Sequence, residues 1–188
     1  MLLEGSSFIN DEDFVFENTP VKIVASRACP EIELVGFKVG PFEEGKEYEV
    51  RFWIAREMEK AGVARFREEE LLDAMKLYKI HWKERVQSVR QVSSLSEDFY
   101  PRLRRYIARL KKEAVNNPEK MKEYEKVSKL SRDIINCRLK KIVSLASTSM
   151  QTSHFLKNLT REERIVYERL FSIISDCRSK ILKGGGES

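Results

Sequence analysis

The sequence predicts an α+β protein, with a small β-rich domain at residues 1–65 followed by a larger all-α helical bundle domain at residues 66–188. Runs rich in β-branched and apolar residues alternate with turn residues as far as Arg51. After Gly62, apolar residues recur at helical spacing almost to the end of the chain. The second part also contains few glycines and prolines until residue 184. This order of patterns indicates two domains, the β-rich one first.

The β-rich part contains three predicted strands and one short helix. Residues 4–13 are polar and acidic, and we expect them to be loose. Phe52–Ala61 follows the third strand and predicts a helix, which Gly62 can end in the left-handed conformation. The segment Gly62–Arg67 is expected to flex as a linker. The predicted strands are Val21–Ala25, Ile32–Phe37 and Lys46–Arg51.

The helical part contains four predicted helices, with capping residues at two of their starts. Asn117 is a good N-cap and Pro118 suits a first helical position. Thr160 and Glu163 have the spacing of a capping box, so the last helix should begin directly after Thr160. Residues 93–96 break the apolar pattern, and residues 151–158 are expected to form a loop. The first three helices are predicted at Glu68–Val92, Phe99–Ala114 and Pro118–Ser149.

Charge divides the chain at the same place. Residues 1–65 hold 8 Lys and Arg against 13 Asp and Glu, whereas the remainder is strongly basic, because the whole chain has a net charge of +5. A basic surface can bind nucleic acid or an acidic protein. No apolar run approaches the roughly 18 residues of a membrane-spanning helix, and the first residues do not resemble a signal peptide. We therefore expect a cytoplasmic, nucleoid-associated protein with no membrane partner.

The sequence contains no pattern typical of catalysis or of a metal centre. The cysteines Cys29, Cys137 and Cys177 are widely spaced, and the only histidines are His81 and His154. Metal sites need clustered ligands, so neither zinc nor an iron–sulfur cluster is indicated. Nucleophile, phosphate-loop and dinucleotide motifs are missing from the sequence. We expect no enzyme activity, no cofactor and no disulfide.

Basic residues interleave with apolar ones in the third quarter of the chain. Such a pattern can neutralise the phosphates of DNA, and it is also typical of a helix face in solvent. A stand-alone basic helical DNA-binding protein therefore remains an alternative, although no helix-turn-helix or stacking platform accompanies it. The candidate basic surface consists of Arg102, Arg105, Arg109 and Lys112.

The apolar stripes exceed what a small helical core of this length needs. The first helix carries Leu71, Met75, Tyr78, Trp82, Val86 and Val89 on one face. Such surplus either belongs to the internal core or packs against a second chain. We expect part of the next two helices to contact another subunit. The candidate interface residues are Leu103, Tyr106, Ile107, Leu110, Tyr124, Ile134, Ile135 and Ile142.

Two sets of residues occur in the order typical of one known family. The β-rich part has Gly40-Pro41-Phe42, Gly45, Val50 and Trp53, and the helical part has Arg138, Lys141 and Asn158-Leu159-Thr160. With these residues the chain resembles the GINS proteins of archaeal and eukaryotic DNA replication. It is most similar to the archaeal subunit whose β domain comes first, the counterpart of the eukaryotic second and third "partner of Sld five" subunits. The helical part is also similar to the sister subunit, so domain order alone separates the two.

The resemblance implies a non-catalytic scaffold rather than an enzyme. GINS proteins of this kind pair with a sister subunit of reversed domain order and form a 2:2 heterotetramer through their helical domains. The complex implied joins the MCM replicative helicase to a RecJ-like protein and stimulates unwinding as a helicase accessory factor. Links to primase and to the replicative polymerase are also implied. Contact with DNA would be weak or indirect.

Overall fold

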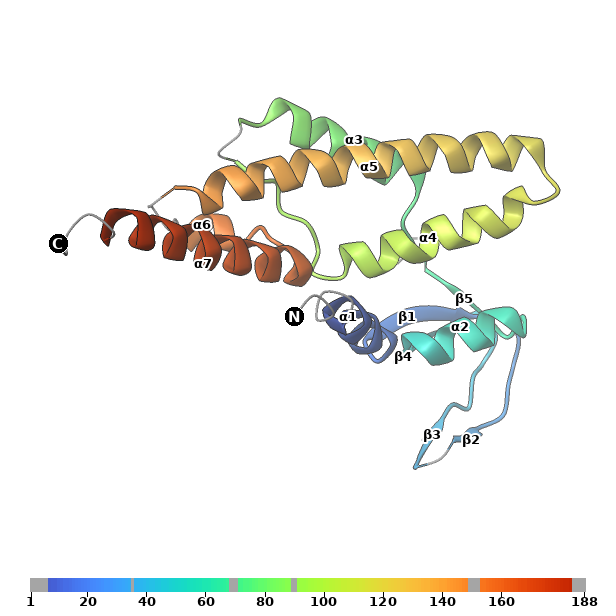
Figure 1. Cartoon of the computed structure of the whole chain (residues 1–188). Helices are drawn as coiled ribbons and strands as arrows, with labels where there is room; N and C mark the ends of the chain where they lie inside the picture. Colours follow the sequence, from blue (N-terminus) through green and yellow to red (C-terminus); the bar gives the residue numbers. More distant parts are fainter. Residues whose placement is uncertain (1–6, 35, 68–70, 89–90, 149–152, 184–188) are drawn as a thin grey trace. The chain divides into compact units, whose positions relative to one another are not determined.

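The computed structural model describes residues 7–34, 36–67, 71–88, 91–148 and 153–183. The chain separates into two compact units, Met1–Leu72 and Asp73–Ser188 (Figure 1). The first unit contains the strands and two helices, and the second contains helices only among its described residues. The predicted α+β class, with the β-rich part first, is confirmed.

A three-stranded antiparallel sheet forms the centre of the N-terminal unit, with β1 (Pro20–Ala25) between β4 (Glu47–Arg51) and β5 (Ala64–Phe66). Side chains alternate along β1, so Val21 and Ile23 are buried while Lys22 lies in solvent. β4 places Val50 opposite Val21. Helix α2 (Phe52–Lys60) adds apolar side chains to this core, as its pattern predicted.

Two segments of this unit differ from the prediction. The expected single strand at Ile32–Phe37 is a hairpin of β2 (Ile32–Leu34) and β3 (Phe37–Val39). Between them Gly36 has a φ of 92°, a backbone conformation that glycine adopts without strain. The expected linker contains β5 (Ala64–Phe66), which pairs with β1. Residues 64–66 therefore belong to the sheet, and the prediction that they flex is wrong.

Helix α1 (Ser7–Glu17) replaces much of the loose segment predicted at residues 4–13. Phe16 is buried, and its ring centroid lies 4.6 Å from that of Phe52. A carboxylate oxygen of Glu17 lies 2.9 Å from Nη1 of Arg56. These contacts with α2 explain how an acidic segment becomes helical, because most helix stability in proteins comes from tertiary packing.

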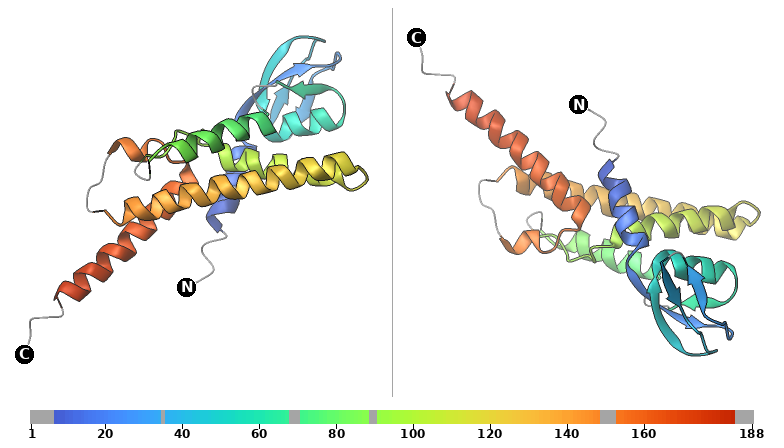
Figure 2. Two further views of the ribbon diagram at one scale, coloured as in Figure 1. Left: turned by 90° about the horizontal axis from the view of Figure 1, so that it is seen from above. Right: turned by 90° about the horizontal axis from the view of Figure 1, so that it is seen from below.

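The C-terminal unit is built around one long helix, α5 (Pro118–Ala146), which contacts α3 (Ala74–Val86), α4 (Phe99–Ala114) and α7 (Arg161–Lys183). A short helix, α6 (Ser153–Leu156), lies within the segment predicted as a loop. Figure 2 shows the C-terminal half of α7 (red) extending away from α5. A cluster of Ile142, Leu145, Phe155, Leu159 and Tyr167 forms the core around the C-terminal end of α5.

The predicted helix boundaries hold where local capping determines them. The Asn117 side chain accepts hydrogen bonds from the backbone N–H groups of Glu119 (3.0 Å) and Lys120 (3.2 Å). The capping box is confirmed, because Glu163 N donates to Thr160 Oγ1 and Thr160 N donates to Glu163 Oε2. By contrast, α3 begins only at Ala74, where Asp73 accepts from Lys76 N at 2.7 Å. Residues 68–70 and 89–90 of the longer predicted helix lie outside the described residues.

Candidate functional site

The glycine–proline motif of the N-terminal unit places Phe42 in the core. Gly40 has a φ of 97°, and a Cβ added there would lie 3.0 Å from a ring carbon of Phe42. The peptide bond between Gly40 and Pro41 is cis. Phe42 exchanges two backbone hydrogen bonds with Cys29 and is 2% exposed. Any side chain at position 40 would thus both strain the backbone and crowd the Phe42 ring.

The remaining motif residues also have structural roles. Gly45 has a φ of 78°, and its N–H donates to the carbonyl of Ala25 at 2.8 Å. Val50 is buried in the sheet core. Trp53 is half-buried and meets Phe37 edge-on, with ring centroids 6.2 Å apart. Packing and turn geometry within this unit account for five of the six motif residues, namely Gly40, Phe42, Gly45, Val50 and Trp53.

Most of the predicted interface residues lie inside the helical unit itself. Leu103, Tyr106, Leu110, Ile134 and Ile142 are each at most 6% exposed. Burial, and then the negative charge of Glu123, raises the pKa of Tyr106 to about 12. Because these five side chains are already covered by their own chain, the prediction that they contact another subunit is wrong for them. They form the core in which α4 packs on α5.

Ile107, Tyr124 and Ile135 are half-buried, and their proposed contact with another subunit stays a prediction. Three further apolar residues of α5 reach solvent, namely Met121 (42% exposed), Leu139 (38% exposed) and Val143 (46% exposed). The sequence pattern did not single these three out.

The candidate basic surface divides into engaged and exposed side chains. Arg102 Nε donates to Asp98 Oδ2 at 2.6 Å, and Arg105 Nη1 donates to the carbonyl of Pro101 at 3.1 Å. The guanidinium of Arg109 lies 5.4 Å from the Tyr106 ring centroid and 3.8 Å from a Glu113 oxygen. Lys112 is exposed. Internal contacts therefore account for part of this basic pattern.

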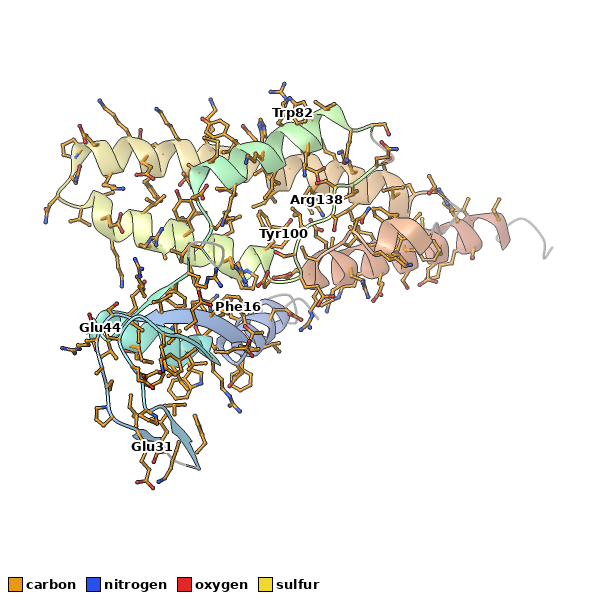
Figure 3. The ribbon with its side chains drawn as sticks, turned by 180° about the vertical axis from the view of Figure 1, so that it is seen from behind. Phe16, Glu31, Glu44, Trp82, Tyr100 and Arg138 are labelled. Carbon is orange, nitrogen blue, oxygen red and sulfur yellow. The ribbon has the colours of Figure 1, made fainter. Side chains whose placement is uncertain are left out.

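The apolar stripe of α3 points into solvent. Exposed fractions are 65% for Met75, 54% for Tyr78, 66% for Trp82 and 65% for Val86. Figure 3 shows Trp82 on the outer side of the helical unit, whereas Arg138 lies between helices. Tyr78 and Trp82, together with Lys79 and Lys83, line an open hollow of about 400 Å³. The stripe was visible in the sequence, but its direction was not.

The opposite side of α3 carries Leu77 and a buried acid, Glu84. The carboxylate of Glu84 accepts hydrogen bonds from Arg138 Nη1 and from Lys141 Nζ, the latter at 2.8 Å. It also accepts from the backbone N–H of Ser93 at 3.1 Å. Burial alone would raise the pKa of Glu84, but Lys141, Ser93 and Arg138 outweigh burial and hold that pKa below its ordinary value.

Arg138 connects this acid to the start of α7. Its Nε and Nη2 donate to the two carboxylate oxygens of Glu163 at 2.5 and 2.7 Å, and Nη2 also donates to the Asn158 carbonyl at 3.2 Å. The Tyr100 hydroxyl donates to Glu163 at 2.6 Å, and burial followed by the charge of Glu163 raises the pKa of Tyr100. Burial would lower the pKa of Arg138, but Glu163 and Glu84 raise it above its ordinary value.

This buried ion network fixes which side of α3 faces inward. Turning α3 to bury its apolar stripe would move Glu84 away from Arg138 and Lys141. Lys141 would then be buried without its carboxylate partner, and Arg138 would keep only Glu163. Breaking a buried ion pair in this way costs about 3–5 kcal/mol. The apolar stripe therefore remains outside as long as the helical unit is alone.

Among the described residues, no group of three or more His, Cys, Asp or Glu side chains is arranged to hold a metal ion. The three cysteines are free thiols. None of the described helices combines the length and hydropathy that crossing a membrane requires.

Comparison with known families gives two matches that follow one another along the chain. Residues 68–182, more than half of the chain, match the helical bundle domain of GINS complex proteins, the Sld5 family. Residues 9–66 match the PSF2 N-terminal domain. No curated protein matches the chain. The two matches correspond to the helical and the strand-rich unit and occur in the predicted order. The chain therefore belongs to the GINS family, as a DNA-replication subunit in which a PSF2-like domain precedes the helical bundle domain.

Proposed function

We propose that this GINS subunit is a non-catalytic scaffold that bridges the MCM replicative helicase and a RecJ-like partner and thereby stimulates unwinding. The observation that carries the proposal is the exposed apolar stripe on α3, held outward by the buried ion network. Large exposed apolar patches on soluble proteins mark binding surfaces. Tyr78 and Trp82 belong to the residue types that contribute most where interfaces are strongest.

Two other helices support an assembly role. Helix α5 exposes Leu139 and Val143, and α7 exposes Ile173, Ile181 and Leu182. Burying apolar surface contributes about 25 cal/mol per Å², so covering several such faces makes a stable complex favourable. We propose a sister subunit of reversed domain order as the main partner, in a 2:2 heterotetramer. Primase and the replicative polymerase are further proposed partners, consistent with a place on the chromosome.

The test has two steps. Light scattering measures the mass of the chain alone and after addition of the sister subunit, and an unwinding assay then measures the rate of the MCM helicase with and without the complex and the RecJ-like protein. We expect a heterotetramer and a faster helicase. A chain that stays monomeric with the sister subunit, or a complex that leaves the unwinding rate unchanged, contradicts the proposal.

Direct DNA binding is the weaker alternative. Arg102 and Arg105 are half-buried and bonded within α4 or to its N-cap, which lowers the number of cations available to phosphates. DNA binding through phosphates weakens steeply as salt rises. Tight, salt-sensitive binding of a duplex by the isolated chain would favour this alternative over the scaffold.

A further inference from the structure

The outer side of α3 combines an apolar row with positive charge. We name it the α3 platform and define it by the following residues. Its apolar row is Met75, Tyr78, Trp82 and Val86, and its cations are Lys79, Lys83 and Arg85.

The apolar row has the length and spacing of a helix-packing surface. Its members occupy positions i, i+3, i+7 and i+11, so they share one face over a length of about 16 Å. A second helix laid along such a ridge contacts all four side chains, in the way an amphipathic helix occupies a groove or ridge of its partner. The row ends in the aliphatic side chains of Met75 and Val86, which a helix can cover along with the two aromatic ones.

The charge of the platform has one sign. Lys79, Lys83 and Arg85 are exposed, and among the described residues no carboxylate forms an ion pair with any of them. The single acid of α3, Glu84, is buried and bonded to Arg138 and Lys141. A partner with acidic residues beside its apolar face therefore meets complementary charge, whereas a basic partner is repelled.

These observations favour a protein helix over nucleic acid. Single-stranded nucleic acid could stack on Tyr78 and Trp82 while lysines bind phosphates. It would leave Met75 and Val86 in water, however, because neither aliphatic side chain stacks a base. An acidic amphipathic helix satisfies the apolar row and the cations together.

We propose that an acidic amphipathic helix of a partner protein packs on the α3 platform. This inference rests on the proposed function, in that it names the chemistry of one partner surface in the assembly. The buried ion network supplies a rigid base, because Glu84 holds α3 on α5 from the inner side.

The test uses the full chain with a photoreactive benzoylphenylalanine in place of Tyr78, irradiated in an extract of the source cells. Mass spectrometry identifies the cross-linked segment. We expect a helical segment rich in Asp and Glu, with apolar residues at i, i+3 or i+4, and i+7. A nuclease-sensitive cross-link, a lipid adduct, a cross-link to a second copy of this chain, a segment without acidic excess, or no cross-link at all would each overturn the inference.

Charge variants make the test specific. The triple variant Lys79→Glu, Lys83→Glu, Arg85→Glu should reduce the cross-link yield about tenfold, because it replaces attraction by repulsion. The control Lys111→Glu, Lys112→Glu reverses the charge of two exposed lysines of α4 outside the platform and should leave the yield unchanged. Equal yields from the triple variant and wild type contradict the inference, provided that circular dichroism shows both folded.

Light scattering with the sister subunit separates this inference from the proposed function. A normal heterotetramer without an acidic cross-linked segment removes the inference alone. Failure to form any heterotetramer removes the proposed function.

Discussion

The inner and outer sides of α3 differ in a way that reverses the usual division between core and surface. The inner side holds Glu84, fully buried with Arg138 and Lys141, while the outer side holds Trp82 and three other apolar residues in solvent. Hydrophobic burial alone would turn the helix the other way. The comparison teaches that a buried charge network can set the orientation of a helix and keep an apolar face available for another chain.

The largest expected effect comes from removing the centre of the inner side. Arg138→Ala removes the guanidinium that bonds both Glu84 and Glu163, leaving Glu84 with Lys141 and Glu163 without its bidentate partner. We expect a loss of about 3–5 kcal/mol in the free energy of unfolding. Urea unfolding followed by circular dichroism measures this loss. The control Arg132→Ala changes an exposed arginine of the same helix and should cost less than about 0.5 kcal/mol. A loss below about 1 kcal/mol for Arg138→Ala would mean that the network does not fix α3.

The loss of unfolding free energy on truncation to alanine distinguishes a residue of the internal core from one on an exposed helix face. Leu110→Ala removes a side chain that is 1% exposed, and such cavities cost about 2–5 kcal/mol of unfolding free energy. Ile173→Ala, on an exposed part of α7, should cost less than about 0.5 kcal/mol in the isolated chain. Thermal unfolding of the monomer measures both. Similar losses for the two variants would undo the assignment of Leu110 to the internal core.

A substitution on the outer side of α3 should weaken binding of the partner protein without changing the stability of the monomer. Trp82→Ala should leave the unfolding free energy of the monomer within about 0.5 kcal/mol of wild type. The binding free energy of the Trp82→Ala chain for the partner that packs on the α3 platform should fall by about 2 kcal/mol, which is roughly 30-fold in Kd, because we expect Trp82 to be a binding hot spot. Titration calorimetry with the assembled partner measures the second effect, and Lys112→Ala is an exposed control outside the platform. Wild-type affinity in Trp82→Ala would show that the platform is not used.

Acid provides a smaller and more gradual test of the inner side. The pKa of Glu84 in the folded chain lies below the ordinary value of 4.5, so its contribution to stability is complete above pH 4.5 and is lost as pH falls through the folded pKa. Below pH 4.5, wild type should therefore lose unfolding free energy more steeply than Glu84→Gln. Urea unfolding at a series of pH values measures the two slopes. Parallel slopes would indicate that Glu84 does not titrate differently on folding.

The sequence was informative where structure depends on neighbouring residues. Asn117 with Pro118, and Thr160 with Glu163, gave the starts of α5 and α7 because capping bonds span only two or three positions. The orientation of α3 was not predictable in this way. It depends on bonds from Glu84 to Arg138 and Lys141, which lie 54 and 57 positions away in the chain.

The candidate interface residues also show what helical spacing cannot predict. Helical spacing identified Leu103, Leu110 and Ile134 as apolar and on one face, but the same spacing describes a core and an interface equally well. The sequence pattern does not indicate helix α1, because three consecutive acids at residues 11–13 give the segment a polar pattern. Its contacts with α2 come from Phe16 to Phe52 and from Glu17 to Arg56. Neither distinction is local, so neither could be read from the pattern alone.

The chain has only two tryptophans, one in each compact unit. Trp53 sits half-buried against Phe37, while Trp82 lies open to water, so their fluorescence spectra should differ without any attached dye. With Trp53 replaced by phenylalanine, the remaining emission would come from α3 alone. The molecule thus carries its own optical reporter at the place where assembly is expected.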